Sequence, residues 1–213
     1  MKLYQYHHCP YCIRADMVAN YKNVPHEKVY LLNDDEQSCF DLIGAKVCPI
    51  LQFDDGTAMK ESLDIVAKLD ALGDKAKVIS ALEDGDKFEQ LFVKIKPSMR
   101  ILTYPRTILI GLPEFETQSA RDYFEGKKEK MIDMSFEQAT MQSAQHIGIV
   151  NAVLAQLPEL PINADLGMDD ILLFPTLRNL SMVKGLNFKP QTLDYMQHIA
   201  KLTNSELYLA QAL

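Results

Sequence analysis

The chain has 213 residues, 47% hydrophobic and 24% charged, with a formal net charge of −7 at pH 7. Such a composition is typical of a globular protein with enough chain to bury its own core, and it excludes collagen-like and disordered classes. The acidic balance and the lack of a dense run of Lys and Arg argue against nucleic acid as a partner.

The sequence carries no recognisable targeting signal. No apolar segment with a small-residue cleavage site opens the chain, and no apolar stretch reaches the roughly 18 residues that a membrane helix needs. The four cysteines, Cys9, Cys12, Cys39 and Cys48, fall in the first quarter of the chain and do not form a disulfide framework. We therefore expect a reduced, cytoplasmic protein without a membrane segment.

The first 72 residues alternate short strand and helix patterns. The predicted elements are a strand over 2–6, a helix over 9–22, a strand over 26–32, a weak helix over 39–42, strands over 50–53 and 57–59, and a helix after 62. Asp55-Gly56 is a hairpin signal between the last two strands. Ser62 is the expected N-cap of the final helix, and Gly73 follows its end.

After Gly73 the pattern becomes helical. The predicted helices run over 88–104, 119–131 continuing to 157, 169–183 and 192–202. The sequence therefore predicts a small α/β domain (1–72), a linker (73–87) and a larger all-helical domain (88–213).

The motif Cys9-Pro10-Tyr11-Cys12 stands where the first predicted strand passes into a helix. Pro10 suits a first helical turn, and cysteines three residues apart lie on neighbouring positions and can close a disulfide. The unpaired N–H groups and the dipole of a helix N-terminus favour an anion. We therefore expect Cys9 to be a nucleophile of low pKa and Cys12, one turn in, to be the resolving thiol.

A zinc site built from the cysteines, with His7 or His8, is the alternative interpretation. Structural zinc sites usually present two tight cysteine pairs, whereas Cys39 and Cys48 are nine residues apart. Thiol chemistry is therefore preferred, and no metal is expected.

Two further stretches fit a peptide-like ligand. Pro49 enters a strand directly after a loop, which makes the Cys48–Pro49 bond a candidate cis peptide. Glu61 and Ser62 stand at a second helix start, where the simpler interpretation is an N-cap. Alternatively, Ser62 and the free N–H groups bind a carboxylate of a ligand, and Glu61 binds an ammonium of the same ligand. A carboxylate beside an ammonium is the free end of an amino acid.

Taken together, these motifs resemble a glutaredoxin domain built as the N-terminal half of a glutathione-transferase-like protein, and above all the bacterial glutaredoxin 2 family. The likeness continues through Asp169-Asp170-Ile171, Leu173-Phe174-Pro175 and Leu177-Arg178-Asn179-Leu180. It implies an α/β thioredoxin-like domain followed by an all-α domain, in a monomer. It also implies glutathione as co-substrate and no permanently bound cofactor.

The resemblance implies a glutathione site as well. In it the γ-glutamyl end is held at a helix start, the cysteinyl backbone pairs with the residue before a cis-proline that faces Cys9, and an aromatic ring flanks the sulfur. The residues at these positions are Glu61 and Ser62, Cys48 and Pro49, and Tyr11.

The reaction implied by the resemblance is thiol exchange. Cys9 attacks a protein disulfide or a glutathione mixed disulfide, Cys12 resolves the protein-linked intermediate, and glutathione regenerates the dithiol. For the glycyl carboxylate of glutathione the sequence offers three candidate cations, Arg14, Lys22 and Lys46.

The sequence departs from the family pattern at two positions. A valine commonly precedes the cis-proline, whereas here it is Cys48, which either packs as a small apolar residue or provides a third thiol that forms an alternative disulfide or captures glutathione. Gly167 caps a later helix where the family usually has Ser or Thr, at a cost of roughly a few tenths of a kcal/mol.

Two other residues are given simpler roles. His8 is either a polar loop residue or a positive charge that supports the thiolate. Cys39 is expected to be structural.

Two other functions share this architecture. Glutathione transferases conjugate an electrophile and commonly use Tyr, Ser or a single Cys, so the presence of both Cys9 and Cys12 argues for exchange instead. A non-enzymatic glutathione-binding module keeps the fold without turnover.

Overall fold

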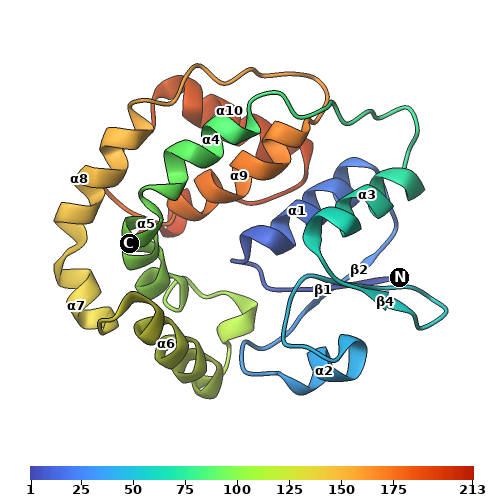
Figure 1. The fold of residues 1–213 in the computed structure, drawn as a ribbon, viewed down its shortest axis with the longest axis horizontal. Coiled ribbons are helices and arrows are strands. Elements are labelled where there is room, and N and C mark those ends of the chain that lie inside the picture. Colours follow the sequence, from blue (N-terminus) through green and yellow to red (C-terminus); the bar gives the residue numbers. More distant parts are fainter.

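A four-stranded sheet and a ring of helices stand side by side in the molecule (Figure 1). The computed structural model describes the backbone of residues 1–213 and every side chain except that of Asp86. The elements of the first part are β1 (Lys2–Gln5), α1 (Pro10–Tyr21), β2 (Glu27–Tyr30), α2 (Gln37–Ile43), β3 (Ile50–Gln52), β4 (Ala58–Met59) and α3 (Ser62–Leu72).

The sheet has the strand order β2-β1-β3-β4. β1 and β2 are parallel, as the predicted strand–helix–strand unit requires, while β3 and β4 form the predicted antiparallel hairpin. Side chains alternate between the two faces. Leu3 and Leu51 belong to the large core with α1 and α3, and Ile50 packs with Cys39 under α2 on the other face (Figure 1).

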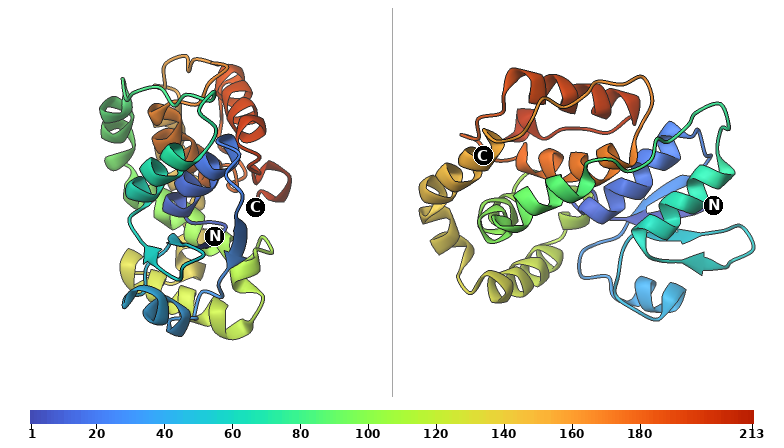
Figure 2. Two further views of the ribbon diagram at one scale, coloured as in Figure 1. Left: turned by 90° about the vertical axis from the view of Figure 1, so that its right-hand side faces the viewer. Right: turned by 45° about the horizontal axis from the view of Figure 1, so that its top comes forward.

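The helical part follows a connecting segment from Gly73 to Asp84. Its elements are α4 (Gly85–Val93), α5 (Lys96–Thr107), η1 (Pro113–Phe115), α6 (Gln118–Ile132), α7 (Phe136–Met141), α8 (Ser143–Leu154), α9 (Met168–Leu180), α10 (Pro190–Leu202) and η2 (Leu209–Gln211). The helical part packs on the first part through α9, which lies against α1 (Figures 1 and 2).

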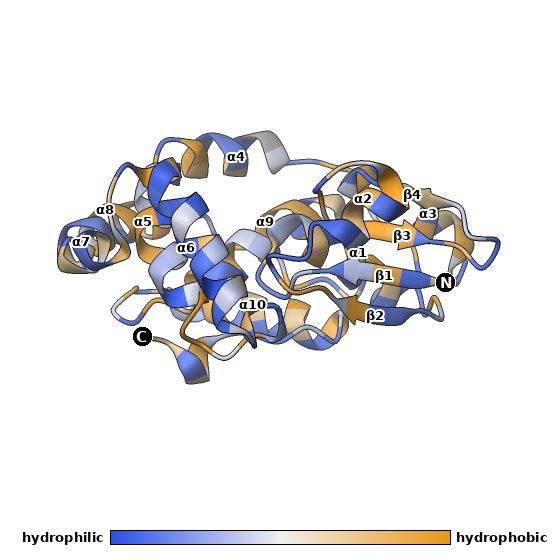
Figure 3. Ribbon diagram, turned by 90° about the horizontal axis from the view of Figure 1, so that it is seen from below, coloured by the Kyte–Doolittle hydropathy of each residue, from blue (hydrophilic) through white to orange (hydrophobic). Residues whose placement is uncertain are grey.

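One apolar core runs through both parts. It joins Leu3 and Met17 of the first part to Phe174, Leu177 and Tyr195 of the second, all of them fully buried. Helices at the rim keep a polar outer side, and hydrophilic and hydrophobic residues mix along α6 (Figure 3). In the described part of the chain, no helix combines the length and the apolarity that crossing a bilayer requires.

The predicted helices of the second part are longer than the observed ones. The predicted helix over 88–104 is two helices: α4 begins earlier, at Gly85, and α5 begins beside Pro97, which suits a first turn. The predicted stretch over 119–157 is divided at Asp133, which is left-handed with φ 56°, and Ser135 then caps α7. The spacing of apolar residues continues across these breaks, so it does not mark where one helix ends and the next begins.

The expected N-cap at Ser62 is wrong by one residue. Glu61 occupies the cap of α3 with φ 72°, and Ser62 is the first helical residue. Among the described residues no side chain caps this terminus.

Candidate active site

The Cys-x-x-Cys motif lies where β1 leads into α1. Cys9 is the N-cap of α1, with φ −73° and ψ 119°, and its Sγ accepts a hydrogen bond from the backbone N–H of Cys12 at 3.4 Å. Pro10 follows as the first helical residue. Cys9 is half-buried, whereas Cys12 is 0% exposed, so only the first thiol is open to a substrate.

The two thiols differ in acidity. The pKa of Cys9 is lowered to about 7, first by the Cys12 thiol as hydrogen-bond donor, then by the charge of His8 and the N–H groups of Cys12 and Tyr11, against the effect of burial. Burial raises the pKa of Cys12 well above its ordinary value. At neutral pH a large fraction of Cys9 is therefore thiolate while Cys12 keeps its proton, which is the expected division of roles.

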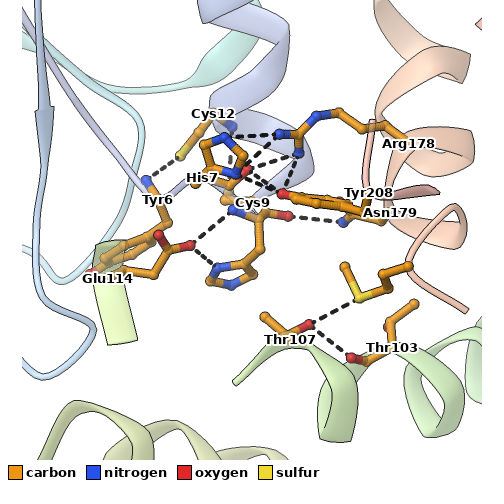
Figure 4. A network of polar contacts seen from close by, with 12 residues as sticks. Tyr6, His7, Cys9, Cys12, Thr103, Thr107, Glu114, Arg178, Asn179 and Tyr208 are labelled. Atoms are coloured by element: carbon orange, nitrogen blue, oxygen red, sulfur yellow. Dashed lines mark hydrogen bonds and ion pairs between the residues drawn. The ribbon is translucent and has the colours of Figure 1, made fainter. Parts of the chain in front are cut away.

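The loop before Cys9 is held by the helical part of the chain (Figure 4). The Glu114 carboxylate, 0% exposed, accepts hydrogen bonds from the His8 backbone N–H at 2.9 Å and from His8 Nδ1 at 2.5 Å. Asn179 donates to the His8 carbonyl at 2.9 Å, and Arg178 donates to the His7 carbonyl at 2.9 Å. The residue before the nucleophile is thus fixed by side chains more than 100 positions away.

Glu114 and His8 also interact electrostatically. Burial acts to raise the pKa of Glu114, but hydrogen bonds from His8 and its charge outweigh burial, so the pKa is lowered. The charge of the His8 ring also lowers the pKa of Cys9. For His7 the balance is reversed, because burial and then the charge of Arg178 lower its pKa to about 4.

A cleft of about 760 Å³ opens in front of Cys9, between the sheet domain and helices α4, α5 and α6. Tyr11, which is 50% exposed, and Cys48 line it beside Cys9. The cleft is basic although the whole chain is acidic. Its cations are Arg14, Lys46, Lys96, Arg100, Lys127 and Lys128, and Glu89 is an acidic residue in its lining.

The predicted ligand residues lie at different depths. The Cys48–Pro49 bond is cis, as predicted, and Pro49 is buried behind Cys48. Glu61 is exposed and Ser62 half-buried at the start of α3, directly before Leu63, which lines the cleft. Glu61, Ser62 and Pro49 are not themselves among the described residues of the cleft wall.

The three cations predicted as candidates for the glycyl carboxylate lie at different positions relative to the cleft. Arg14 and Lys46 line the cleft, and the Nε of Arg14 is buried without a hydrogen-bond partner among the described residues. Lys22 is buried at the far end of α1, where its Nζ contacts Asp70 at 2.8 Å. Lys22 is therefore ruled out as a ligand in this cleft.

Sequence reasoning missed the residues that support the nucleophile from the second domain. Arg178 and Asn179 belong to a stretch that carried the family resemblance, but no role was assigned to them. Glu114 stands in a short 3₁₀ turn with no motif around it, and nothing in the sequence signals that it is fully buried against His8.

All four cysteines are reduced thiols. Within the described part of the chain, His, Cys, Asp and Glu side chains form no group of three or more arranged to hold a metal ion. The geometry around Cys9 and Cys12 is thus that of a dithiol, with one thiol facing the cleft and one behind it.

A thioredoxin-like sheet domain with a dithiol at a helix N-terminus, covered by an all-helical domain, defines a thiol protein of the glutathione-transferase-like architecture. Residues 87–212 match the model of the glutaredoxin 2 C-terminal domain, and residues 3–76 match the glutathione S-transferase N-terminal domain. Glutaredoxin 2 of Escherichia coli K12 is 37% identical over 218 residues, covering 100% of both chains. The chain belongs to the glutaredoxin 2 family, and its enzyme class is that of a glutathione-dependent oxidoreductase.

Solved structures agree with this assignment. Glutaredoxin 2 from Salmonella typhimurium, in complex with glutathione, has a TM-score of 0.90 and 36% identity, with 100% of this chain and 98% of that chain covered. A glutathione transferase from Phanerochaete chrysosporium has a TM-score of 0.60 at 11% identity, with 96% and 98% covered, and shares the fold alone.

Proposed function

We propose that this chain reduces protein disulfides and glutathione mixed disulfides through the dithiol of Cys9 and Cys12, with glutathione as the reductant. The observation that carries the proposal is the asymmetry of the pair: the half-buried thiol at the N-terminus of α1 has a pKa of about 7, and its buried partner keeps its proton. A thiolate facing a cleft attacks an incoming disulfide, and a protonated thiol behind it is available to resolve the product.

The site residues predicted from the sequence fit one glutathione molecule. The backbone of Cys48, before cis-Pro49, pairs with the cysteinyl backbone by a strand-edge interaction. The exposed Glu61 carboxylate takes the ammonium of the γ-glutamyl end, and Ser62 with the uncapped N–H groups of α3 takes its carboxylate. Tyr11 flanks the sulfur from the cleft wall.

Arg14 is the cation we assign to the glycyl carboxylate. It lines the cleft, its guanidinium stacks 5.0 Å above the Tyr11 ring, and its buried Nε lacks a partner among the described residues. A buried donor without a partner is costly, and a ligand carboxylate satisfies it. Lys46 is the weaker candidate, because its Nζ already donates to the Asp35 carbonyl at 2.6 Å.

In the proposed cycle Cys9 attacks one sulfur of the substrate disulfide and forms a mixed disulfide, while the other sulfur leaves as a thiolate. Where the mixed disulfide holds a protein, Cys12 attacks the Cys9 sulfur, expels the protein thiol and closes Cys9–Cys12, which two glutathione molecules reduce to the dithiol with release of oxidised glutathione. Where it holds glutathione, a second glutathione attacks the sulfur of the bound one and releases Cys9 and oxidised glutathione. Residues 1–72 supply this chemistry and 88–213 support it, in a monomer that works in the reducing cytoplasm without a bound metal or cofactor.

The test is reduction of hydroxyethyl disulfide by glutathione, coupled to glutathione reductase, for the wild type, Cys9→Ser and Cys12→Ser. We expect Cys9→Ser to fall below about 1% of wild-type turnover because the nucleophile is lost. Cys12→Ser keeps turnover within about tenfold, since reduction of a glutathione mixed disulfide needs one thiol only.

The competing functions give different results in the same experiment. Conjugation of chlorodinitrobenzene with negligible disulfide reduction identifies a transferase. Glutathione binding without turnover in the wild type identifies a binding module, and either outcome refutes the proposal.

A further inference from the structure

The cysteines that the sequence separates lie together in the fold. Cys48 and Cys39 pack in one apolar cluster on the α2 face of the sheet, and Cys48 and Cys9 line the same cleft. Tyr6 belongs to that cluster too, and its backbone N–H donates to the Cys12 sulfur at 3.5 Å (Figure 4). Cys48 thus has a cysteine neighbour on either side.

The neighbouring strands β1 and β3 bring the residues around these cysteines together. β1 and β3 are antiparallel, with Lys2 opposite Gln52 and Tyr4 opposite Ile50. The ladder ends at Tyr4 and Ile50, and beyond it Tyr6 and Cys48 pack in the same apolar cluster, while the Tyr6 N–H contacts the Cys12 sulfur. Cys48 therefore lies near Cys12, and each of these two thiols influences the pKa of the other.

The four thiols differ in access. Cys9 and Cys48 are half-buried at the cleft, whereas Cys12 and Cys39 are 0% exposed. A disulfide from solution therefore reaches Cys12 only through a neighbouring cysteine. Two accessible thiols, Cys9 and Cys48, share that buried neighbour.

We propose that Cys48 is a third redox thiol, which attacks the Cys12 sulfur of the Cys9–Cys12 disulfide and moves the disulfide to Cys12–Cys48. The step rests on the proposed dithiol function. The Cys12–Cys48 bond forms, the Cys9–Cys12 bond breaks, and Cys9 leaves as a thiolate. The Cys48 thiol gives up its proton on attack, and neither an oxidant nor a reductant is consumed.

The acidities of the three groups favour this direction. Cys9, with a pKa of about 7, is a good leaving group. The pKa of Cys48 is lowered, first by the Cys12 thiol, and the thiol of Cys39 and the charge of Lys46 also lower it. Once Cys12 is in a disulfide its thiol no longer contributes, but the repulsion from a Cys9 thiolate is gone as well, and Cys39 and Lys46 still stabilise the anion.

A donor for the Cys48 thiolate is also present. The Tyr6 hydroxyl is buried without a partner among the described residues, and its pKa is raised by burial and then by nearby thiols, Cys48 first among them. It therefore keeps its proton at the pH of the exchange.

The third thiol allows an oxidised form that a protein with only two redox cysteines does not keep, namely one with both an internal disulfide and glutathione on Cys9. With the disulfide moved to Cys12–Cys48, the Cys9 thiolate is free to attack oxidised glutathione, whose S–S bond breaks and releases one glutathione. The resulting Cys9–glutathione mixed disulfide is protected, because the thiol that would expel glutathione is already oxidised. A pair without Cys48 expels it and closes Cys9–Cys12 again.

Peptide mapping tests the proposal directly. The reduced protein is treated with excess oxidised glutathione, free thiols are blocked in acid, and the chain is cleaved after Lys and Arg. Cys9 and Cys12 then share peptide 3–14, Cys39 lies in peptide 29–46, and Cys48 lies in peptide 47–60. We expect peptide 3–14 to be joined to peptide 47–60 and to carry one glutathione on Cys9.

Two variants and one activity measurement complete the design. Cys39→Ala keeps the joined peptides, whereas Cys48→Val loses them and gives an internal disulfide in peptide 3–14 without glutathione. A wild type that reduces hydroxyethyl disulfide but shows only the internal disulfide, or only peptides 29–46 and 47–60 joined, overturns this inference alone. A wild type without turnover overturns the proposed function instead.

Discussion

The pKa of Cys9 determines how much reactive thiolate the site holds, and neighbouring groups set this pKa. The Cys12 thiol is the largest influence that lowers the pKa of Cys9 to about 7, ahead of the His8 charge and the backbone N–H groups of α1. The sequence predicted an effect of the helix N-terminus and, in one of two interpretations, of a positive charge on His8, and both act in the same direction. In the proposed cycle the buried cysteine resolves the intermediate, and before the reaction its thiol lowers the pKa of Cys9.

This dual role predicts a pH profile. Because the thiolate is the reactive form, the rate of Cys9 alkylation by iodoacetamide rises as pH passes through a midpoint near 7. In Cys12→Ala the leading donor is gone, so the midpoint moves up toward the ordinary thiol value of about 8.5. In Cys12→Ser a hydroxyl still donates, and the midpoint stays closer to 7.

Cys39→Ala is the matched control, since it removes another buried thiol and leaves Cys12 in place. Its midpoint is expected near that of the wild type. If the midpoint in Cys12→Ala also remains near 7, the helix terminus and His8 set the acidity without the second cysteine.

Among the elements, the local geometry around Cys9 and Pro49 could be predicted from the sequence. The strand-to-helix position of Cys9, the hairpin and the cis bond before Pro49 follow from local signals, because turn residues, caps and proline act within a few residues. The helices of the second domain were predicted too long, since one apolar period spans separate helices. Glu114 was missed because its burial depends on packing between distant segments.

The start of α9 shows why a glycine caps a helix where the family usually has Ser or Thr. Gly167 N–H donates to Asp170 at 2.8 Å, and Ser80 of the connecting segment runs alongside, donating to the Leu166 carbonyl and accepting from Met168 N–H. A Cβ added at Gly167 would lie 2.7 Å from Ser80 Oγ. A side chain at position 167 therefore requires the Ser80 hydroxyl to move.

We predict that Gly167→Ser gives no gain in the free energy of unfolding, and a loss of up to about 1 kcal/mol, because Ser80 must move. In the Ser80→Ala background the same change becomes stabilising by roughly a few tenths of a kcal/mol, since a Ser cap is better than Gly once there is room. Urea unfolding of the two single variants and the double variant measures the coupling. Strict additivity would contradict the role given to Ser80.

At the scale of the whole molecule, the second domain is a part of the active site. η1 and α9 hold the His7–His8 loop through Glu114, Arg178 and Asn179, and one core joins the two domains. A nucleophile whose neighbours come from another domain changes its acidity when the contact between the domains changes. Glu114 is the residue through which this dependence is measurable, because its carboxylate pairs with the His8 ring.

Glu114→Gln keeps the size of the side chain and an acceptor for the His8 N–H, but removes the negative charge next to the His8 ring. The His8 charge that lowers the pKa of Cys9 then loses its partner, so we expect the alkylation midpoint of Cys9 to rise above 7 and hydroxyethyl disulfide turnover to fall at pH 6–7, with little change above pH 9. Loss of the charge-assisted hydrogen bond also lowers the free energy of unfolding, by about 1–3 kcal/mol. The control is Glu116→Gln, an exposed carboxylate two residues on, which should leave both quantities unchanged. A Glu114→Gln variant that loses stability while its alkylation midpoint stays near 7 would mean that this carboxylate only holds the loop, and that the helical domain does not tune the nucleophile.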